Sequence, residues 1–293
     1  MSARIYEVEH STVYAYDEEV EQSSHLLRLR PSSDRYQDVL DFSLKVTPAA
    51  SLREFEDVFG NSAVRLDFDS SFREMRVLSR SRVRVFAPAR GLRETRERSI
   101  IPVQWMPWQR EMMAAYLQAP DLSSSQLRDL YEYAMSFVER QDFDVVGTLE
   151  DINRTLHQDC TYEPGSTDLE TTPWDVYVCR RGVCQDFANL FVCLARLLGI
   201  PARYRVGYVH SGVDDPRRLQ SEASHAWAEL YVPRLGWRGF DPTNGSVVGL
   251  DHVRVACGRN YRDATPTSGT IHRGGGGETL SIAVSVKEAS LPP

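Results

Sequence analysis

The spacing of the hydrophobic residues constrains the fold of this chain more than any other feature, because it follows two regular patterns in turn. Within residues 1–90, apolar and polar side chains alternate in four segments, at 4–16, 39–46, 64–68 and 74–86. These segments are also rich in β-branched and aromatic residues. Alternation of this kind predicts strands with one buried and one solvated face, as in an antiparallel β-sandwich or barrel.

Helical spacing replaces this alternation from about residue 127 onward. One apolar stripe comprises Leu127, Leu130, Tyr131, Ala134 and Val138. A shorter helical pattern runs from 149 to 156, and the most apolar one runs from Cys184 to Gly199, where Gly199 and Pro201 indicate a stop. Further strands are predicted at 202–209, 225–232 and 237–240. Strands that precede a mixed segment of helices and strands indicate the α+β class.

The length of 293 residues is typical of about two domains. We expect an N-terminal β domain over residues 1–100 and a second domain over 101–293. The second domain would begin with a linker and helices at 101–160. It would end with a closing strand at 279–286, after the four-glycine run at 274–277.

Charge and hydropathy limit the classes of partner that the chain is expected to bind. The 34 basic and 41 acidic residues give a net charge of −7, so the usual electrostatic signature of a nucleic-acid-binding protein is missing. The first ten residues lack the apolar core of a signal peptide, and no apolar run reaches the length of a membrane span. We therefore expect a cytoplasmic protein that binds neither nucleic acid nor membrane, and a homo-oligomer stays compatible with the sequence.

The cysteines raise the question of a reactive thiol. Their number is odd, and without a secretory signal a disulfide framework is not expected. No two of them have the Cys-x-x-Cys spacing of a zinc site, so we predict no metal and no cofactor. The five positions are Cys160, Cys179, Cys184, Cys193 and Cys257.

Cys184 is the candidate nucleophile because it follows Arg180-Arg-Gly-Val183 and opens the most apolar helix. At a helix N-terminus, unpaired N–H groups and the helix dipole stabilise a thiolate. Taken alone, Cys184 is also compatible with a small buried hydrophobic residue, which is the commoner fate of an isolated cysteine.

A base and an orienting acid follow at the ends of two predicted strands. His225 begins one strand and Asp241 ends the next, and the short turn at Leu235-Gly236 makes these two strands an antiparallel hairpin. The start of one strand then returns beside the end of the other, so the Asp241 carboxylate can accept the imidazole N–H and fix the tautomer. The alternatives are a satisfied, partly buried histidine and a turn-forming aspartate before Pro242.

Four motifs in this order resemble the papain-like core of the transglutaminase-like family: Gly-Val-Cys184-Gln-Asp-Phe-Ala, Ile200-Pro-Ala-Arg-Tyr, Ser-His225-Ala-Trp-Ala-Glu and Phe-Asp241-Pro-Thr-Asn. The first 90 residues are similar to the β domain that precedes this core in bacterial members. The resemblance implies a helix bearing Cys184 that packs on an antiparallel sheet bearing His225 and Asp241.

The resemblance also implies a chemistry in which Cys184 attacks a peptide or carboxamide carbonyl and forms a thioester. The substrate would be a peptide, a protein or a small amide. The backbone N–H of Cys184 would contribute to an oxyanion hole, with Tyr162 as the candidate second donor; the alternative for Tyr162 is a core tyrosine. The acyl group could pass to water or to an amine, as in a cross-linking transglutaminase. A binding or scaffold protein with a vestigial core is the third hypothesis.

Overall fold

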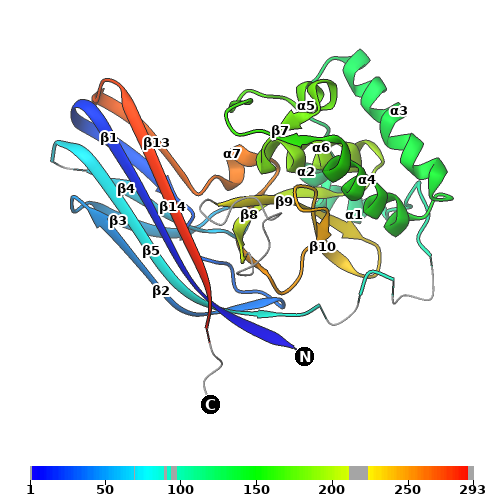
Figure 1. The fold of residues 1–293 in the computed structure, drawn as a ribbon, viewed down its shortest axis with the longest axis horizontal. Helices are drawn as coiled ribbons and strands as arrows, with labels where there is room; N and C mark the ends of the chain where they lie inside the picture. Colours follow the sequence, from blue (N-terminus) through cyan, green and yellow to red (C-terminus); the bar gives the residue numbers. More distant parts are fainter. Residues whose placement is uncertain (1, 69, 89–90, 94–97, 211–223, 290–293) are drawn as a thin grey trace.

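The computed structural model describes residues 2–68, 70–88, 91–93, 98–210 and 224–289. It consists of a long curved sheet and a mixed helix-and-sheet core beside it (Figure 1). The predicted α+β class is confirmed. In place of a sandwich or a barrel, the N-terminal strands form one curved antiparallel sheet.

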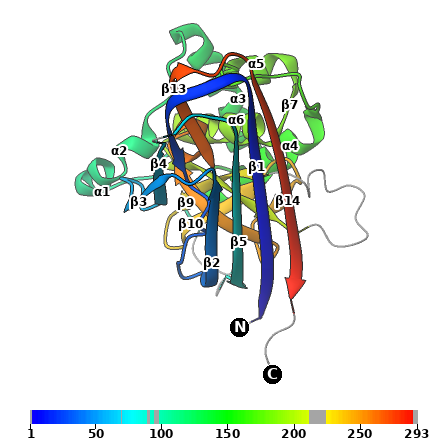
Figure 2. The ribbon, with the colours of Figure 1, turned by 90° about the vertical axis from the view of Figure 1, so that its left-hand side faces the viewer.

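Seven strands make up the curved sheet. The strand β1 (Ala3–Leu27) lies at its centre, and its first half pairs with β5 (Phe72–Phe86) on one side and β14 (Glu278–Ala289) on the other. Figure 2 shows these strands from the front, with β2 beyond β5. The second half of β1 pairs with two further strands. The remaining members are β2 (Gln37–Thr47), β3 (Ser51–Glu56), β4 (Ser62–Asp67) and β13 (Thr267–Gly274).

The closing strand corrects the expected division of the chain. The sequence predicts a strand at 279–286 that completes the second domain, and a strand is indeed present there. However, β14 pairs with β1 from Ile5↔Ala289 to Tyr16↔Glu278 and so belongs to the N-terminal sheet. The alternation of a strand specifies which face is buried, but not which distant strand provides its hydrogen bonds.

The four-glycine run joins β13 to β14 and rests on an irregular stretch of β1. Gly274 has a φ of +81°, and a Cβ atom there would lie 2.0 Å from the Glu19 carbonyl oxygen. The Gly275 N–H donates to that same carbonyl at 2.9 Å. A side chain at Gly274 would therefore clash with β1, which explains why this turn requires glycine.

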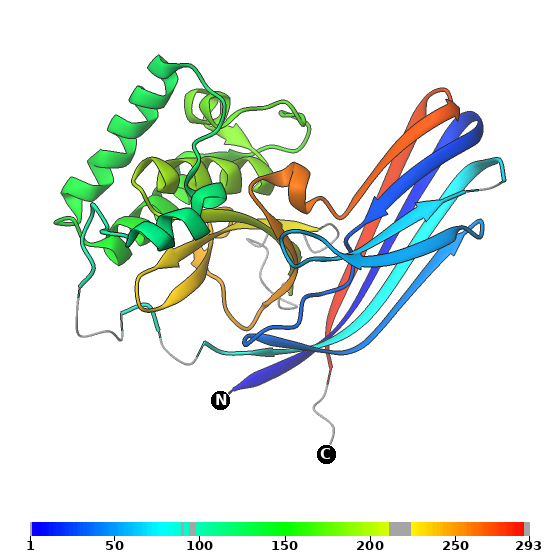
Figure 3. The ribbon, with the colours of Figure 1, turned by 180° about the vertical axis from the view of Figure 1, so that it is seen from behind.

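The core is built on a five-stranded antiparallel sheet in the order β11-β10-β9-β8-β12. Its strands are β8 (Ala202–Val209), β9 (His225–Val232), β10 (Gly236–Asp241), β11 (Ser246–Val247) and β12 (His252–Gly258). The larger helices gather on one face of this sheet (Figure 3). The principal ones are α3 (Ser124–Arg140), α4 (Val145–Asp159), α5 (Pro173–Cys179) and α6 (Cys184–Leu197).

The shorter elements complete the core. The helices α1 (Pro107–Met112) and α2 (Ala114–Leu117) precede α3, and α7 (Tyr261–Ala264) follows the sheet. Two short parallel strands, β6 (Thr161–Tyr162) and β7 (Arg181–Gly182), flank α5. The predicted capping box of α3 is confirmed, because the Ser123 hydroxyl accepts from the Gln126 N–H and the Gln126 side chain accepts from the Ser123 N–H.

The curved sheet and the core share one hydrophobic cluster. Tyr6, Val8 and Val83 of the curved sheet are buried together with Cys184 and Tyr208 of the core. Hydrogen bonds also cross the boundary, since His10 Nδ1 lies 3.0 Å from the Tyr208 hydroxyl. The N-terminal sheet therefore lies directly against the elements that carry the candidate site.

Two amide side chains attach the N-terminal part to the free edge of β12. Asn61 accepts from the Cys257 N–H at 2.8 Å and donates to the Cys257 carbonyl at 2.7 Å. Gln37 does the same at Arg254, with distances of 2.8 Å and 2.7 Å. Each amide thus satisfies both backbone groups of one residue, as a neighbouring strand would.

Candidate active site

Cys184 is the first residue of α6, as the sequence predicts. Val183 before it is extended, and the helix begins at the cysteine. The Asp186 carboxylate caps the N-terminus of α6 by accepting a hydrogen bond from the Val183 N–H at 2.8 Å. It also accepts one from the Thr167 hydroxyl at 2.7 Å. Cys184 is therefore held at the end of a helix where free N–H groups favour negative charge.

The residues just before Cys184 are fixed by close packing. A Cβ atom at Gly182 would lie 2.8 Å from the Asp186 carboxylate, so the capping carboxylate occupies the space that a side chain would need. Gly182 also pairs with Tyr162 through the short strands β7 and β6. This pairing brings the predicted oxyanion residue beside the start of α6.

The Tyr162 hydroxyl is buried and has no hydrogen-bond partner among the described residues. Burial raises the pKa of Tyr162, and the nearby Cys184 and Asp186 raise it further. The hydroxyl is therefore protonated at neutral pH and has a proton to donate.

His225 and Asp241 meet as the hairpin predicts. His225 Nε2 donates to Asp241 Oδ2 at 2.8 Å, and both side chains are almost fully buried. Burial alone would lower the pKa of His225. The charge of Asp241, the hydrogen bond to Asp241 and the nearby Cys184 thiol together raise that pKa to about 10. The other ring nitrogen, Nδ1, has no hydrogen-bond partner within the described residues.

The Asp241 carboxylate is held by several donors besides His225. Its Oδ1 accepts from the backbone N–H groups of Thr243 and Asn244, and its Oδ2 accepts from the Asn244 side chain at 2.6 Å. Burial alone would raise the pKa of Asp241, but the His225 and His252 rings hold this pKa well below its usual range. Asp241 is thus ionised, and it forms the turn before Pro242 at the same time.

His252, at the start of β12, is a member of the site that sequence reasoning misses. Its Nε2 donates to the same Asp241 oxygen at 3.2 Å, so two histidines share one carboxylate. Burial lowers the pKa of His252. The hydrogen bond to Asp241 and its charge oppose this effect, and the positive charge of His225 adds to it. The signal available in the sequence is the alternation His252-Val-Arg-Val-Ala256, which is typical of a strand.

A buried ion cluster lies on the same side of β9 as His225. The Glu229 carboxylate contacts Arg205 and Arg203 of β8, each at 2.8 Å, and Arg254 of β12 at 3.4 Å. Burial would raise the pKa of Glu229, but the three guanidinium groups hold it well below its usual range. The cluster links three of the five strands and thereby supports the strand that carries His225.

All five cysteines are unpaired thiols: Cys179 is exposed and the other four are buried. Within the described ranges, no group of three or more His, Cys, Asp or Glu side chains is arranged to hold a metal ion. In that same part of the chain, none of the helices has both the length and the apolar character that crossing a membrane requires.

Comparisons with known proteins agree with this architecture. Residues 6–84 match the model of the bacterial transglutaminase-like N-terminal region, and residues 132–242 match that of the transglutaminase-like superfamily. An uncharacterised protein of Mycobacterium tuberculosis is 30% identical over 96% of this chain and 92% of its own length. An uncharacterised protein of Mycobacterium leprae is 28% identical over 95% and 97%.

A solved structure has the same fold. The crystal structure of a candidate cysteine protease from Cytophaga hutchinsonii superposes with a TM-score of 0.78, at 23% identity, over 100% of this chain and 93% of that one. Together with the two matched regions, this similarity covers both the curved sheet and the core. The chain therefore belongs to the transglutaminase-like superfamily and carries the bacterial N-terminal region in front of its core.

Proposed function

We propose that the protein is a thiol-dependent hydrolase of peptide or carboxamide bonds, with Cys184 as nucleophile, His225 as base and Asp241 as the orienting acid. The observation that carries the proposal is the buried His225–Asp241 pair beside Cys184. Nε2 of the imidazole is bonded to the carboxylate, while Nδ1 is left for a further partner. The thiol is near enough to contribute to the raised pKa of His225.

The reaction follows from these groups. Because the pKa of His225 is about 10, its Nδ1 already holds the proton that Cys184 gives up before the substrate arrives, and the sulfur attacks the carbonyl carbon to form a C–S bond. The C–N bond then breaks, and the imidazolium gives its proton to the departing amine. Water attacks the thioester, with its proton passing to His225 Nδ1, which releases the acid and restores the starting Cys184–His225 pair. Asp241 keeps the tautomer and stabilises the imidazolium at each stage.

The oxyanion of each tetrahedral intermediate needs donors. The backbone N–H of Cys184, at the start of α6, supplies one. Tyr162 supplies the second in this proposal, because its hydroxyl is protonated, buried and without a partner among the described residues. Removal of one such donor typically slows acyl transfer by about 10²-fold to 10³-fold.

The test compares two thiols of the folded protein under limiting iodoacetamide, with mass spectrometry to locate the label. Cys179 is exposed and Cys184 is only 7% exposed, so accessibility alone predicts labelling of Cys179. We expect faster labelling of Cys184, because it begins a helix and lies beside His225, which takes its proton. The variant Cys184→Ala should fold and form no acyl-enzyme, whereas Cys179→Ala should behave as the wild type. Preferential labelling of Cys179 would contradict the proposal.

The acceptor of the acyl group is tested separately. If an amine in place of water took this group from Cys184, the protein would be a transferase. The mass of the product formed with and without added methylamine distinguishes the two. We expect the free acid in both cases; a product that carries methylamine would establish the transferase instead. A thiol that reacts no faster than Cys179 and forms no acyl-enzyme would favour the binding or scaffold protein.

A further inference from the structure

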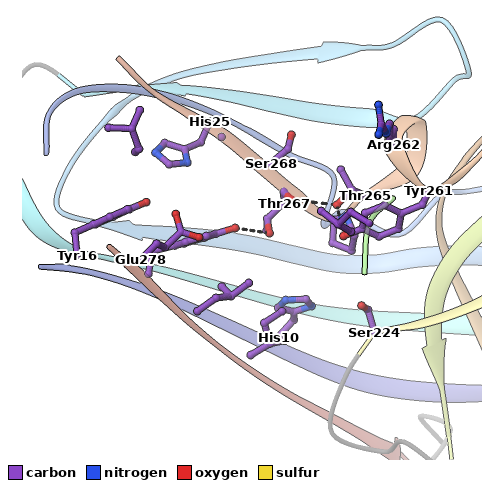
Figure 4. Close-up of a pocket in the computed structure, with 17 residues that line it drawn as sticks. His10, Tyr16, His25, Ser224, Tyr261, Arg262, Thr265, Thr267, Ser268 and Glu278 are labelled. Atoms are coloured by element: carbon purple, nitrogen blue, oxygen red, sulfur yellow. Dashed lines mark hydrogen bonds between the residues drawn. The ribbon is translucent and has the colours of Figure 1, made fainter. Parts of the chain in front are cut away.

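A cavity of about 420 Å³ lies where the curved sheet faces the core. Ser224, next to His225 in the chain, lines one end of it together with Tyr261 of α7. Tyr16 and Glu278 lie together at the other end (Figure 4). The cavity therefore extends from the neighbourhood of the candidate base to the concave face of the N-terminal sheet.

The strand register explains why these side chains share one face. Glu278 pairs directly with Tyr16, and Leu280 pairs with Tyr14, across β14 and β1. Ile282, two residues further on, again lies on that face, because strand side chains alternate with a period of two. Leu280 and Ile282 are 46% and 41% exposed, which leaves apolar surface open inside the cavity.

One buried polar group in the cavity lacks a partner. Tyr16 is 6% exposed, and its hydroxyl lies close to the Glu278 carboxylate but makes no hydrogen bond of normal geometry among the described residues. Tyr14, beside it, is satisfied by the Thr267 hydroxyl at 2.7 Å. A hydroxyl left unpaired in a buried position indicates a site that a ligand or water completes.

The end of the cavity that holds Tyr16 and Glu278 carries a negative charge without a cationic partner among the described lining residues. Burial lowers the pKa of both His10 and His25 to about 4, so both rings are neutral at pH 7. The cationic lining residue Arg262 is paired with Glu170 at 2.6 Å. Glu278 forms no ion pair within the described part of the chain, and it is the carboxylate that remains in the cavity.

From this arrangement, we infer that the cavity is a recognition site for a lysine-type group of the substrate, with a primary ammonium at Glu278 and Tyr16 and an unbranched aliphatic stem along Leu280 and Ile282. Tyrosine rings add a favourable surface for the cation. Because an ammonium paired with a carboxylate keeps its proton, the group held here is not a nucleophile. The inference rests on the proposed function only in calling this ligand a part of the substrate.

Binding is tested in the full-length Cys184→Ala variant, where the result does not depend on any reaction. Calorimetry compares n-pentylamine with hexanoate, which has the same stem and the opposite charge. We expect the amine to bind about tenfold more tightly or better, the usual scale of a charge-assisted contact. Glu278→Gln should remove this preference, and Tyr16→Phe should weaken amine binding. Glu288→Gln, on the same strand but outside the cavity lining, is the matched control and should change nothing.

A second measurement connects the cavity to the thiol of the wild-type protein. Lysyl chloromethyl ketone should alkylate Cys184 about tenfold faster than the norleucyl reagent, which lacks only the ammonium, and Glu278→Gln should abolish the difference. Equal affinity for amine and carboxylate, or a preference that survives Glu278→Gln, would overturn the inference and leave the reactivity of Cys184 unaffected. Amine binding without a reactive Cys184 would overturn the proposed function and keep the site.

Discussion

Replacing Asp241 with asparagine should move the titration of His225 from the alkaline side of neutrality to the acidic side. The structure offers an internal comparison, because His10 is equally buried but has no carboxylate partner. Burial lowers the pKa of His10 to about 4, whereas the pKa of His225 rises to about 10 beside Asp241. In Asp241→Asn the burial effect remains and the charge is lost, so we expect His225 to titrate below 6.5, its value without these surroundings.

The size of the effect follows from the same values. A rise from 6.5 to about 10 corresponds to roughly 5 kcal/mol at most, at about 1.4 kcal/mol for each pKa unit. This stabilisation is complete below pH 6.5, the unfolded value of the histidine, and is lost as the pH rises through about 10. The lowered pKa of Asp241 acts in the opposite direction: its stabilisation is present above pH 3.8 and disappears as the pH falls.

The assay is NMR of the histidine ring Cε1–H groups between pH 5 and pH 10, with the His225 signal assigned by its loss in His225→Gln. The wild-type ring should remain protonated at pH 8 and that of Asp241→Asn should be neutral there. Asn244→Ala removes one donor to the carboxylate but leaves its charge, so its His225 should titrate like the wild type. A neutral His225 at pH 8 in the wild type, or the same titration in Asp241→Asn, would refute this reasoning.

Three other substitutions test separate parts of the structure. Tyr162→Phe should slow acyl-enzyme formation by about 10²-fold but leave iodoacetamide labelling unchanged, because alkylation develops no oxyanion; equal slowing of both reactions would contradict the assigned role. Glu229→Gln should lower the free energy of unfolding in urea by about 3–5 kcal/mol, since Arg205 would stay buried without its partner; a loss below about 1 kcal/mol would show that the cluster contributes little. Asn61→Ala should lower the same quantity by about 2–4 kcal/mol, because the backbone groups of Cys257 lose both partners; an unchanged urea midpoint would argue against this.

The candidate site was predictable where it depends on local structure. The start of α6 follows from the residues around Cys184, and the meeting of His225 with Asp241 follows from a hairpin with a short turn. Both are decided by residues close together in the sequence. The same is true of the alternating strands in the first 90 residues.

The parts that were not predictable depend on pairing between distant segments. His252 reaches Asp241 only because β12 pairs with β8 and not with β11, its neighbour in the chain. Likewise, nothing in the alternation of β14 indicates that it returns to β1 and brings Glu278 opposite Tyr16. The packing of the whole molecule decides which distant strands pair, and the residue pattern of a single strand carries no information about this.

The amide contacts at β12 also bear on whether the core can exist alone. A sheet edge with unpaired N–H and C=O groups readily recruits a strand from another molecule. Here Gln37 and Asn61 occupy that edge at Arg254 and Cys257. A fragment cut after the N-terminal strands would lose these two residues and β1 together, and would present β12 as an open template. We therefore expect such a fragment to aggregate more readily than the whole chain.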